Sequence, residues 1–105
     1  MEVRFFGAKQ IDLSLDDTES LAKLDSIELL DLSETSFSSG NLHRFSRLKN
    51  LKVLLLNDTN IDDGSIGMIS DLGQLRKLDI SNTEISRQGF LTIQTRLPDT
   101  EIFYY

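Results

Sequence analysis

Apolar residues recur along the chain at a constant interval, which is the same from Leu30 to Leu54 as from Leu54 to Leu78. Three stretches, 27–37, 51–61 and 75–85, align without gaps and carry Leu or Ile at nearly every shared apolar position. Each stretch is followed by a glycine and two further apolar positions. A degraded copy precedes the first stretch, and a partial copy follows the last. This regularity predicts that one small structural unit is repeated along the whole chain.

The spacing inside each copy predicts one short strand followed by a turn and a helical segment. Leu30 and Leu32, and likewise Leu78 and Ile80, alternate with a polar residue, as a strand with one buried face requires. A strand–helix–strand unit of an open sheet needs about 30 residues or more, which exceeds the length of one copy. The shorter period instead favours a solenoid in which each copy forms one coil.

The repeated pattern resembles a known family motif. The spacing L-x-x-L-x-L recurs three times in register, and it is similar to the leucine-rich repeat, L-x-x-L-x-L-x-x-N/C-x-L. At the Asn/Cys position this chain holds Thr35, Thr59 and Thr83, as in the short Thr-type repeats of bacterial members of that family. A threonine hydroxyl can hydrogen-bond backbone groups that are left free where a strand ends, and we expect these three threonines to do so.

The resemblance implies an α/β fold, namely a right-handed β-α solenoid with a short parallel sheet of about five strands on its concave face. We expect a single leucine-rich repeat domain over residues 1–105. It divides into a degraded N-terminal repeat 1–23, the repeats 24–47, 48–71 and 72–96, and a partial capping repeat 97–105. Because the third full repeat carries an extra residue, we place the last strand one position further along than a constant period would, with Ile102 equivalent to Lys77.

Strand residues that alternate with the buried positions face outward and form rows across neighbouring strands. The first predicted row holds Phe5, Leu29, Val53, Lys77 and Ile102. The second predicted row holds Gly7, Asp31, Leu55, Asp79 and Tyr104, and a third row includes Asn57. These rows would lie on the concave face of the solenoid.

The outward rows predict a protein-binding site, because they combine apolar and aromatic side chains with a few charges. The predicted site residues are Phe5, Leu29, Asp31, Val53, Leu55, Asn57, Lys77, Asp79, Ile102 and Tyr104. In this hypothesis the aliphatic members anchor the partner and the charged members set its register. A second interpretation is that these residues only favour strand formation, or that the chain's own ends cover them.

Composition narrows the class of partner. Lys and Arg together number 11 and Asp and Glu 17, which gives a formal net charge of −6. Nucleic acids and anionic membranes require clustered basic residues, so we expect neither as a partner. Hydrophobic residues make up 39% of the chain, yet no apolar run approaches the ~20 residues of a membrane span and no signal peptide is recognisable. These features favour a cytoplasmic protein with a protein partner.

Catalytic and metal-binding chemistry has little support in the sequence. Cysteine is absent and His43 is the single histidine, whereas metal centres and catalytic triads need several convergent groups. Asp58, Asn60 and Asp62 resemble the start of a calcium loop, but the closing glutamate is missing. We therefore expect no enzymatic activity, no cofactor and no metal. A hydrolase on a repeat scaffold, and phosphate binding by the basic run 44–52, are the minor alternatives.

Self-assembly is the main alternative function. The outer strands, expected at 3–8 and 101–105, would present unpaired edges. The chain could then form a homo-oligomer through these edges or through its concave face, and a concentration-dependent mass would support that interpretation.

Overall fold

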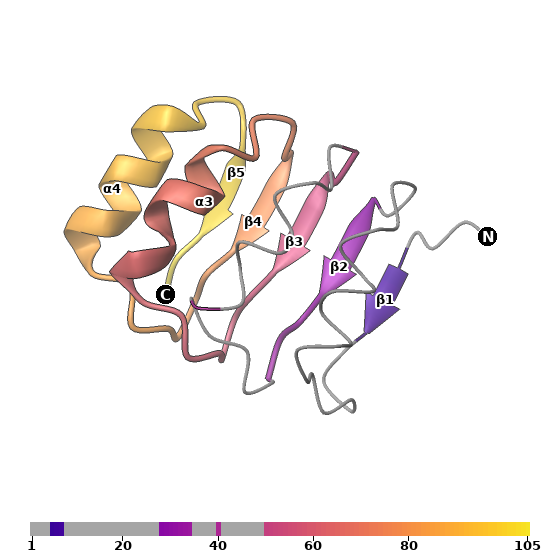
Figure 1. Ribbon diagram of the computed structural model, residues 1–105, viewed down its shortest axis with the longest axis horizontal. Coiled ribbons are helices and arrows are strands. Elements are labelled where there is room, and N and C mark those ends of the chain that lie inside the picture. The colour runs from indigo at the N-terminus through magenta and orange to yellow at the C-terminus, as the bar shows by residue number, and fades with distance from the viewer. Residues whose placement is uncertain (1–4, 8–27, 35–39, 41–49) are drawn as a thin grey trace.

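A computed structural model describes residues 28–34, 40 and 50–105, together with the strand at 5–7. In chain order, the described elements are β1 (Phe5–Gly7), β2 (Leu29–Asp31), β3 (Val53–Leu55), the 3₁₀ helix η2 (Asp63–Ser65), α3 (Ile66–Ser70), β4 (Lys77–Asp79), α4 (Arg87–Arg96) and β5 (Glu101–Phe103) (Figure 1). The predictions that concern Thr35, His43, the basic residues at 44–49 and the side chain of Phe5 lie outside the described residues.

The described strands form one parallel sheet in the order β1-β2-β3-β4-β5. Leu30 lies opposite Leu54, and Leu54 lies opposite Leu78, so neighbouring strands are one repeat apart in the sequence. Residues with the same place in the repeat therefore stack side by side, as a solenoid requires. The predicted α/β fold with a short parallel sheet of about five strands is confirmed.

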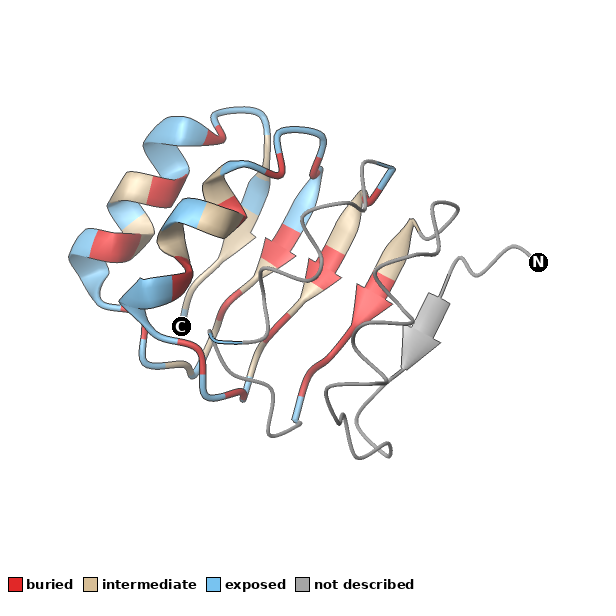
Figure 2. Cartoon of the chain, viewed as in Figure 1, coloured by how far each residue is buried: buried red, intermediate tan, exposed pale blue. Residues whose placement is uncertain are grey.

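The hydrophobic core lies between the sheet and the helices. Helices α3 and α4 lie along one face of the sheet (Figure 1), and both layers contain buried residues (Figure 2) that belong to one cluster. The middle residues of β2, β3 and β4, which are Leu30, Leu54 and Leu78, are 0% exposed. Ile69 of α3 and Ile93 of α4 belong to the same buried cluster. Alternation in the strands and apolar spacing in the helical segments thus predict the core correctly.

Threonine hydroxyls close the ends of the strands, as predicted. Thr59 Oγ1 donates to the carbonyl oxygen of Leu56 at 2.7 Å, and Thr83 Oγ1 donates to that of Ile80 at 2.8 Å. Each bond satisfies a carbonyl at the point where the chain leaves its strand. The prediction is therefore confirmed for these two threonines.

A left-handed residue follows each of the strands β2, β3 and β4. Glu34, Asp58 and Asn82 have φ angles of 59°, 61° and 54°, and they occupy the same position in successive repeats. This backbone conformation lets Asp58 N–H donate to the carbonyl of Ser81 at 3.0 Å, and Asn82 N–H to that of Tyr105 at 3.1 Å. Asp and Asn tolerate this region better than most residues. The turn therefore continues the hydrogen-bond ladder beyond the strand.

The last strand has a different register from the one predicted. Leu78 lies opposite Ile102 and Asp79 opposite Phe103, so β5 follows β4 at the same interval that separates the earlier strands, without the predicted shift of one position. Ile102 and Tyr104 consequently pack against the hydrophobic core. The prediction that these two residues face outward is wrong.

The physical reason is that hydrogen bonding between strands sets the register. Glu101 N–H donates to the carbonyl of Arg76 at 2.8 Å, and Ile80 N–H donates to that of Phe103 at 2.9 Å. The extra residue of the third full repeat is accommodated between β4 and β5, so it does not shift the strand. The helical segments η2 and α3 cover 63–70 and α4 covers 87–96, whereas the connection to the next strand shortens from 71–76 to 97–100. The longer helix is thus compensated by a shorter loop.

Specific contacts stabilise the half-buried Tyr104 in its inward position. Its ring stacks on Phe90 of α4 with the centroids 4.6 Å apart and the planes 8° from parallel. Its hydroxyl donates to the carbonyl of Ile85 at 2.9 Å. Tyr104 therefore holds α4 onto the end of the sheet, a structural role that the sequence did not suggest.

Candidate protein-binding surface

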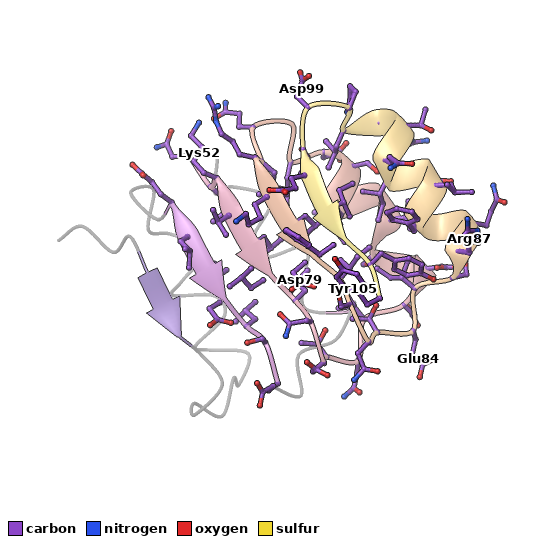
Figure 3. The ribbon with its side chains drawn as sticks, turned by 180° about the vertical axis from the view of Figure 1, so that it is seen from behind. Lys52, Asp79, Glu84, Arg87, Asp99 and Tyr105 are labelled. Carbon is purple, nitrogen blue, oxygen red and sulfur yellow. The ribbon has the colours of Figure 1, made fainter. Side chains whose placement is uncertain are left out.

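The face of the sheet opposite α3 and α4 presents the outward strand residues (Figure 3). We call this surface the open sheet face and define it by the first and last residues of the strands β2 to β5. Its members are Leu29, Asp31, Val53, Leu55, Lys77, Asp79, Glu101 and Phe103. Since strand residues alternate between the two faces, these side chains lie on the side away from the core.

The part of this surface over β2 and β3 is apolar. Leu29 lies opposite Val53 in the register, and Leu55 lies in the next row of the same face. All three side chains are half-buried, whereas Leu30 and Leu54 between them are 0% exposed. The sequence prediction that Leu29, Val53 and Leu55 face outward therefore agrees with their placement.

The part over β4 and β5 is charged and aromatic. Lys77 is exposed, and its ammonium nitrogen lies 5.7 Å from the centroid of the Phe103 ring. The ring of Phe103 is 6.4 Å from that of Tyr105, which follows β5 and is 87% exposed. The aromatic residues on this side are thus Phe103 and Tyr105, in place of the predicted Ile102 and Tyr104.

Asp31 and Asp79 occupy equivalent positions but differ in environment. Asp31 is 6% exposed, and its Oδ1 accepts hydrogen bonds from both the N–H and the hydroxyl of Ser33. The expectation of an exposed Asp31 is wrong, because the carboxylate turns back onto this serine. Asp79 is half-buried, and within the described part of the chain it accepts one hydrogen bond, from the Ser81 N–H at 3.0 Å. The buried Ser81 hydroxyl has no partner among the same residues. Asp79 therefore retains free acceptor capacity.

Asn57 is held in the turn that follows β3. Its side-chain amide donates to Asp58 Oδ2 at 3.0 Å, and Asp58 also accepts a hydrogen bond from the amide of Asn82 in the next repeat. The bonds from Asn82 and Asn57 lower the pKa of Asp58. Asn57 thus lies at the rim of the open sheet face, and its side-chain amide is already hydrogen-bonded to Asp58. Of the predicted Phe5, the structure gives the backbone position, which lies opposite Leu29.

A hollow lies at the edge of the sheet where the strands begin, apart from the open sheet face. It has a volume of about 360 Å³ and is lined by Lys52, Gly73, Gln74, Leu75, Arg76 and Asp99. Lys52 and Arg76 occupy equivalent places in successive repeats, and Asp99 lies at the same edge in Figure 3. Because the hollow is lined by both basic and acidic residues, it favours neither an anionic nor a cationic ligand.

Neither a metal-binding cluster nor a membrane-spanning helix is found in the part of the chain that the structure describes. No three acidic or histidine side chains there converge as they do around a metal ion. Across the same residues, every helix is too short or too polar to span a bilayer.

Sequence comparison identifies one family. A family model described as Zer-1-like, leucine-rich repeats matches residues 18–99. No curated protein matches the chain in sequence. The family match covers the predicted full repeats.

Solved structures resemble the chain in fold. The structure titled "Leiomodin-1 Actin-Binding Site 2 (ABS2)" has a TM-score of 0.72 and 15% identity, over 96% of this chain and 69% of that one. The structure of the Mex67:Mtr2 subunits from Chaetomium has a TM-score of 0.74 and 16% identity, over 94% of this chain and 76% of that one. A leucine-rich repeat protein of Leptospira interrogans has a TM-score of 0.53 and 19% identity, over 86% of this chain and 27% of that one. At these identities the similarity concerns the fold alone.

Proposed function

Because the chain belongs to the Zer-1-like leucine-rich repeat family, we propose that it is a non-catalytic interaction module that binds a protein partner on its open sheet face. The observation that carries the proposal is the half-buried apolar cluster of Leu29, Val53 and Leu55 on the open sheet face. Contiguous apolar residues on a surface with charged neighbours usually belong to an interface.

The size of the surface supports a protein partner. Neighbouring strands lie about 4.8 Å apart, so the five strands span roughly 20 Å. This width is compatible with a modest interface of about 800 Å² per partner. Two of the similar structures carry titles that name actin binding and a complex of Mex67 with Mtr2, which supports a protein partner for this fold.

Leu55→Asp is the variant that tests the binding face. We expect it to weaken capture of the partner from a native lysate at least tenfold, because a charge in an apolar contact is left desolvated. The matched control is Leu91→Asp on α4, where the side chain is 38% exposed on the helical side. Both variants should keep the circular dichroism spectrum of the wild type. Equal capture by the two variants would contradict the proposal.

Self-assembly is the second candidate, and the edge of β5 favours it. The backbone groups of Glu101 and Phe103 bond to the preceding strand, so those of Ile102 and Tyr104 point away from β4. An unpaired edge of this kind can pair with another strand. Mass measured by light scattering between ~10 μM and ~1 mM tests this function, and a constant monomer mass would exclude it.

A further inference from the structure

The open sheet face is divided into an apolar part and a charged part. Leu29, Val53 and Leu55 lie on β2 and β3 together with the buried Asp31, while the accessible acidic and aromatic residues, Asp79, Glu101 and Phe103, lie on β4 and β5. A partner that covers both parts needs different chemistry at its two ends. The two parts therefore constrain the kind of segment that fits, if the proposed function holds.

Two carboxylates beside Phe103 are available to a partner. Asp79 lies opposite Phe103 in the register, and its single described hydrogen bond leaves the Oδ2 oxygen free. Glu101 precedes Phe103 on the same face of β5, and within the described residues its carboxylate makes no hydrogen bond or ion pair. Within the described residues, Phe103 is thus flanked by two carboxylates that retain free acceptor oxygens.

The position over the Phe103 ring already holds a cation from the chain itself. Lys77 lies directly opposite Glu101 in the register, yet its ammonium group lies over the ring of Phe103 at 5.7 Å. A cation over an aromatic face is attracted by the ring's electron density, and arginine is favoured there because its planar group also pairs with carboxylates. The formal net charge of −6 attracts basic segments toward the whole molecule.

We propose that the open sheet face recognises a protein segment in which an apolar residue is followed, three positions later, by arginine. The apolar residue contacts Val53 and Leu55. The guanidinium group displaces the Lys77 ammonium from Phe103 and binds between Asp79 and Glu101, with Tyr105 at the rim. This inference deepens the proposed function and rests on it.

The spacing of three residues follows from the sheet geometry. Leu55 and Phe103 lie in one row two strands apart, which is about 9.6 Å at a strand spacing of about 4.8 Å. A segment in the polyproline II conformation has three residues per turn and advances about 3.1 Å per residue, so side chains three positions apart point to the same side and lie about 9.3 Å apart. The probe is therefore a tetrapeptide with leucine first and arginine last.

The experiment is an amide NMR titration of the full chain with acetyl-Leu-Ser-Ser-Arg-amide. The matched probe, acetyl-Leu-Ser-Ser-Gln-amide, differs only in the basic group. We expect the arginine peptide to shift the resonances of Asp79, Ser81, Glu101 and Phe103, and to bind at least fivefold more tightly than the glutamine peptide. Equal binding of the two peptides, or shifts confined to the hollow around Arg76, would overturn the proposal.

Two variants with opposite expected effects sharpen the test. Asp79→Asn keeps an oxygen for the Ser81 N–H and should lower the affinity for the arginine peptide about fivefold. Lys77→Met removes the competing cation and should raise it about threefold. Asp99→Asn removes one negative charge at the strand-start edge and serves as the control. An unchanged affinity in both Asp79→Asn and Lys77→Met would refute the arginine site.

The outcome also separates this inference from the proposed function. If Leu55→Asp abolishes capture of the partner while Asp79→Asn and Lys77→Met leave it unchanged, the open sheet face binds a protein but not through arginine. If Leu55→Asp captures as well as Leu91→Asp, the proposed function itself fails.

Discussion

Gly89 shows how one residue sets the distance between neighbouring repeats. It lies on the buried side of α4, and a Cβ atom built there would be 2.6 Å from Asp63 Oδ1 and 2.7 Å from Ile66 Cδ1. Both distances are well below van der Waals contact. The absence of a side chain at this position therefore lets α4 approach the helical segment of the preceding repeat.

Overpacking in Gly89→Ala is expected to cost about 1–3 kcal/mol, because the new methyl group forces neighbouring groups apart. Alanine returns ~1 kcal/mol in a helix interior, so the variant should be destabilised by up to about 2 kcal/mol. Gly67→Ala is the matched control, since the glycine is exposed on α3 and has no atom within 4 Å of the new Cβ. It should stabilise by about 0.5–1 kcal/mol. Urea unfolding measures both changes, and the same sign for both would contradict this account.

At the scale of elements, one carboxylate joins two successive helical segments. Asp63 of η2 accepts hydrogen bonds from the N–H of Ser86 at 2.8 Å and from its hydroxyl at 2.7 Å. Ser86 is also the N-cap of α4, and its Oγ accepts the Gly89 N–H at 3.0 Å. The helical segments of neighbouring repeats are thus held together at their first turns, in addition to the packing of their apolar faces.

This connection predicts a pH dependence. Bonds from the Ser86 N–H and then from its hydroxyl lower the pKa of Asp63 below its ordinary value of 3.8. A carboxyl with a depressed pKa stabilises the fold above that ordinary value, and the contribution disappears as the pH falls through the folded-state pKa. In Ser86→Ala the pKa of Asp63 should rise, whereas Ser86→Thr should keep it low. Carboxyl carbon NMR titration measures this, and an unchanged pKa in Ser86→Ala would contradict it.

At the scale of the whole molecule, stability depends on rows of residues that run across the sheet. Leu30, Leu54 and Leu78 form one such row and are 0% exposed. Ile102 ends the row at β5 and is half-buried, because no strand follows it among the described residues. In a solenoid each repeat contacts its neighbours, so interior positions gain packing from both sides and terminal positions from one.

This arrangement predicts that substituting a core residue with alanine lowers the free energy of unfolding more at the centre of the sheet than at its end. Leu54→Ala should destabilise by about 2–5 kcal/mol, the usual range for a fully buried leucine. Ile102→Ala should cost roughly half as much, because less apolar surface and a smaller cavity are involved. Chemical denaturation followed by circular dichroism measures both values. An equal or greater loss for Ile102→Ala would show that the end of the sheet is as well packed as its centre.

The local pattern of the sequence determined the repeat, the core and most of the outward rows. Alternation within each copy placed Leu30, Leu54 and Leu78 inside and Leu29, Val53 and Leu55 outside. The threonine position also predicted its hydrogen bonds correctly. These features depend on the period of a strand and on contacts within one repeat, and both are visible in a short stretch of residues.

Only the tertiary structure decided the end of the sheet and the details of the candidate site. Counting residues from the repeat pattern placed Ile102 and Tyr104 outside, but the ladder between β4 and β5 places Glu101 and Phe103 there. Applying the interval between the earlier strands to the last strand as well would have identified them. The burial of Asp31 and the left-handed turn residues were also absent from the prediction. The register of a strand and the partners of a carboxylate depend on hydrogen bonds to neighbouring groups in space, and the order of residues along one repeat does not specify them.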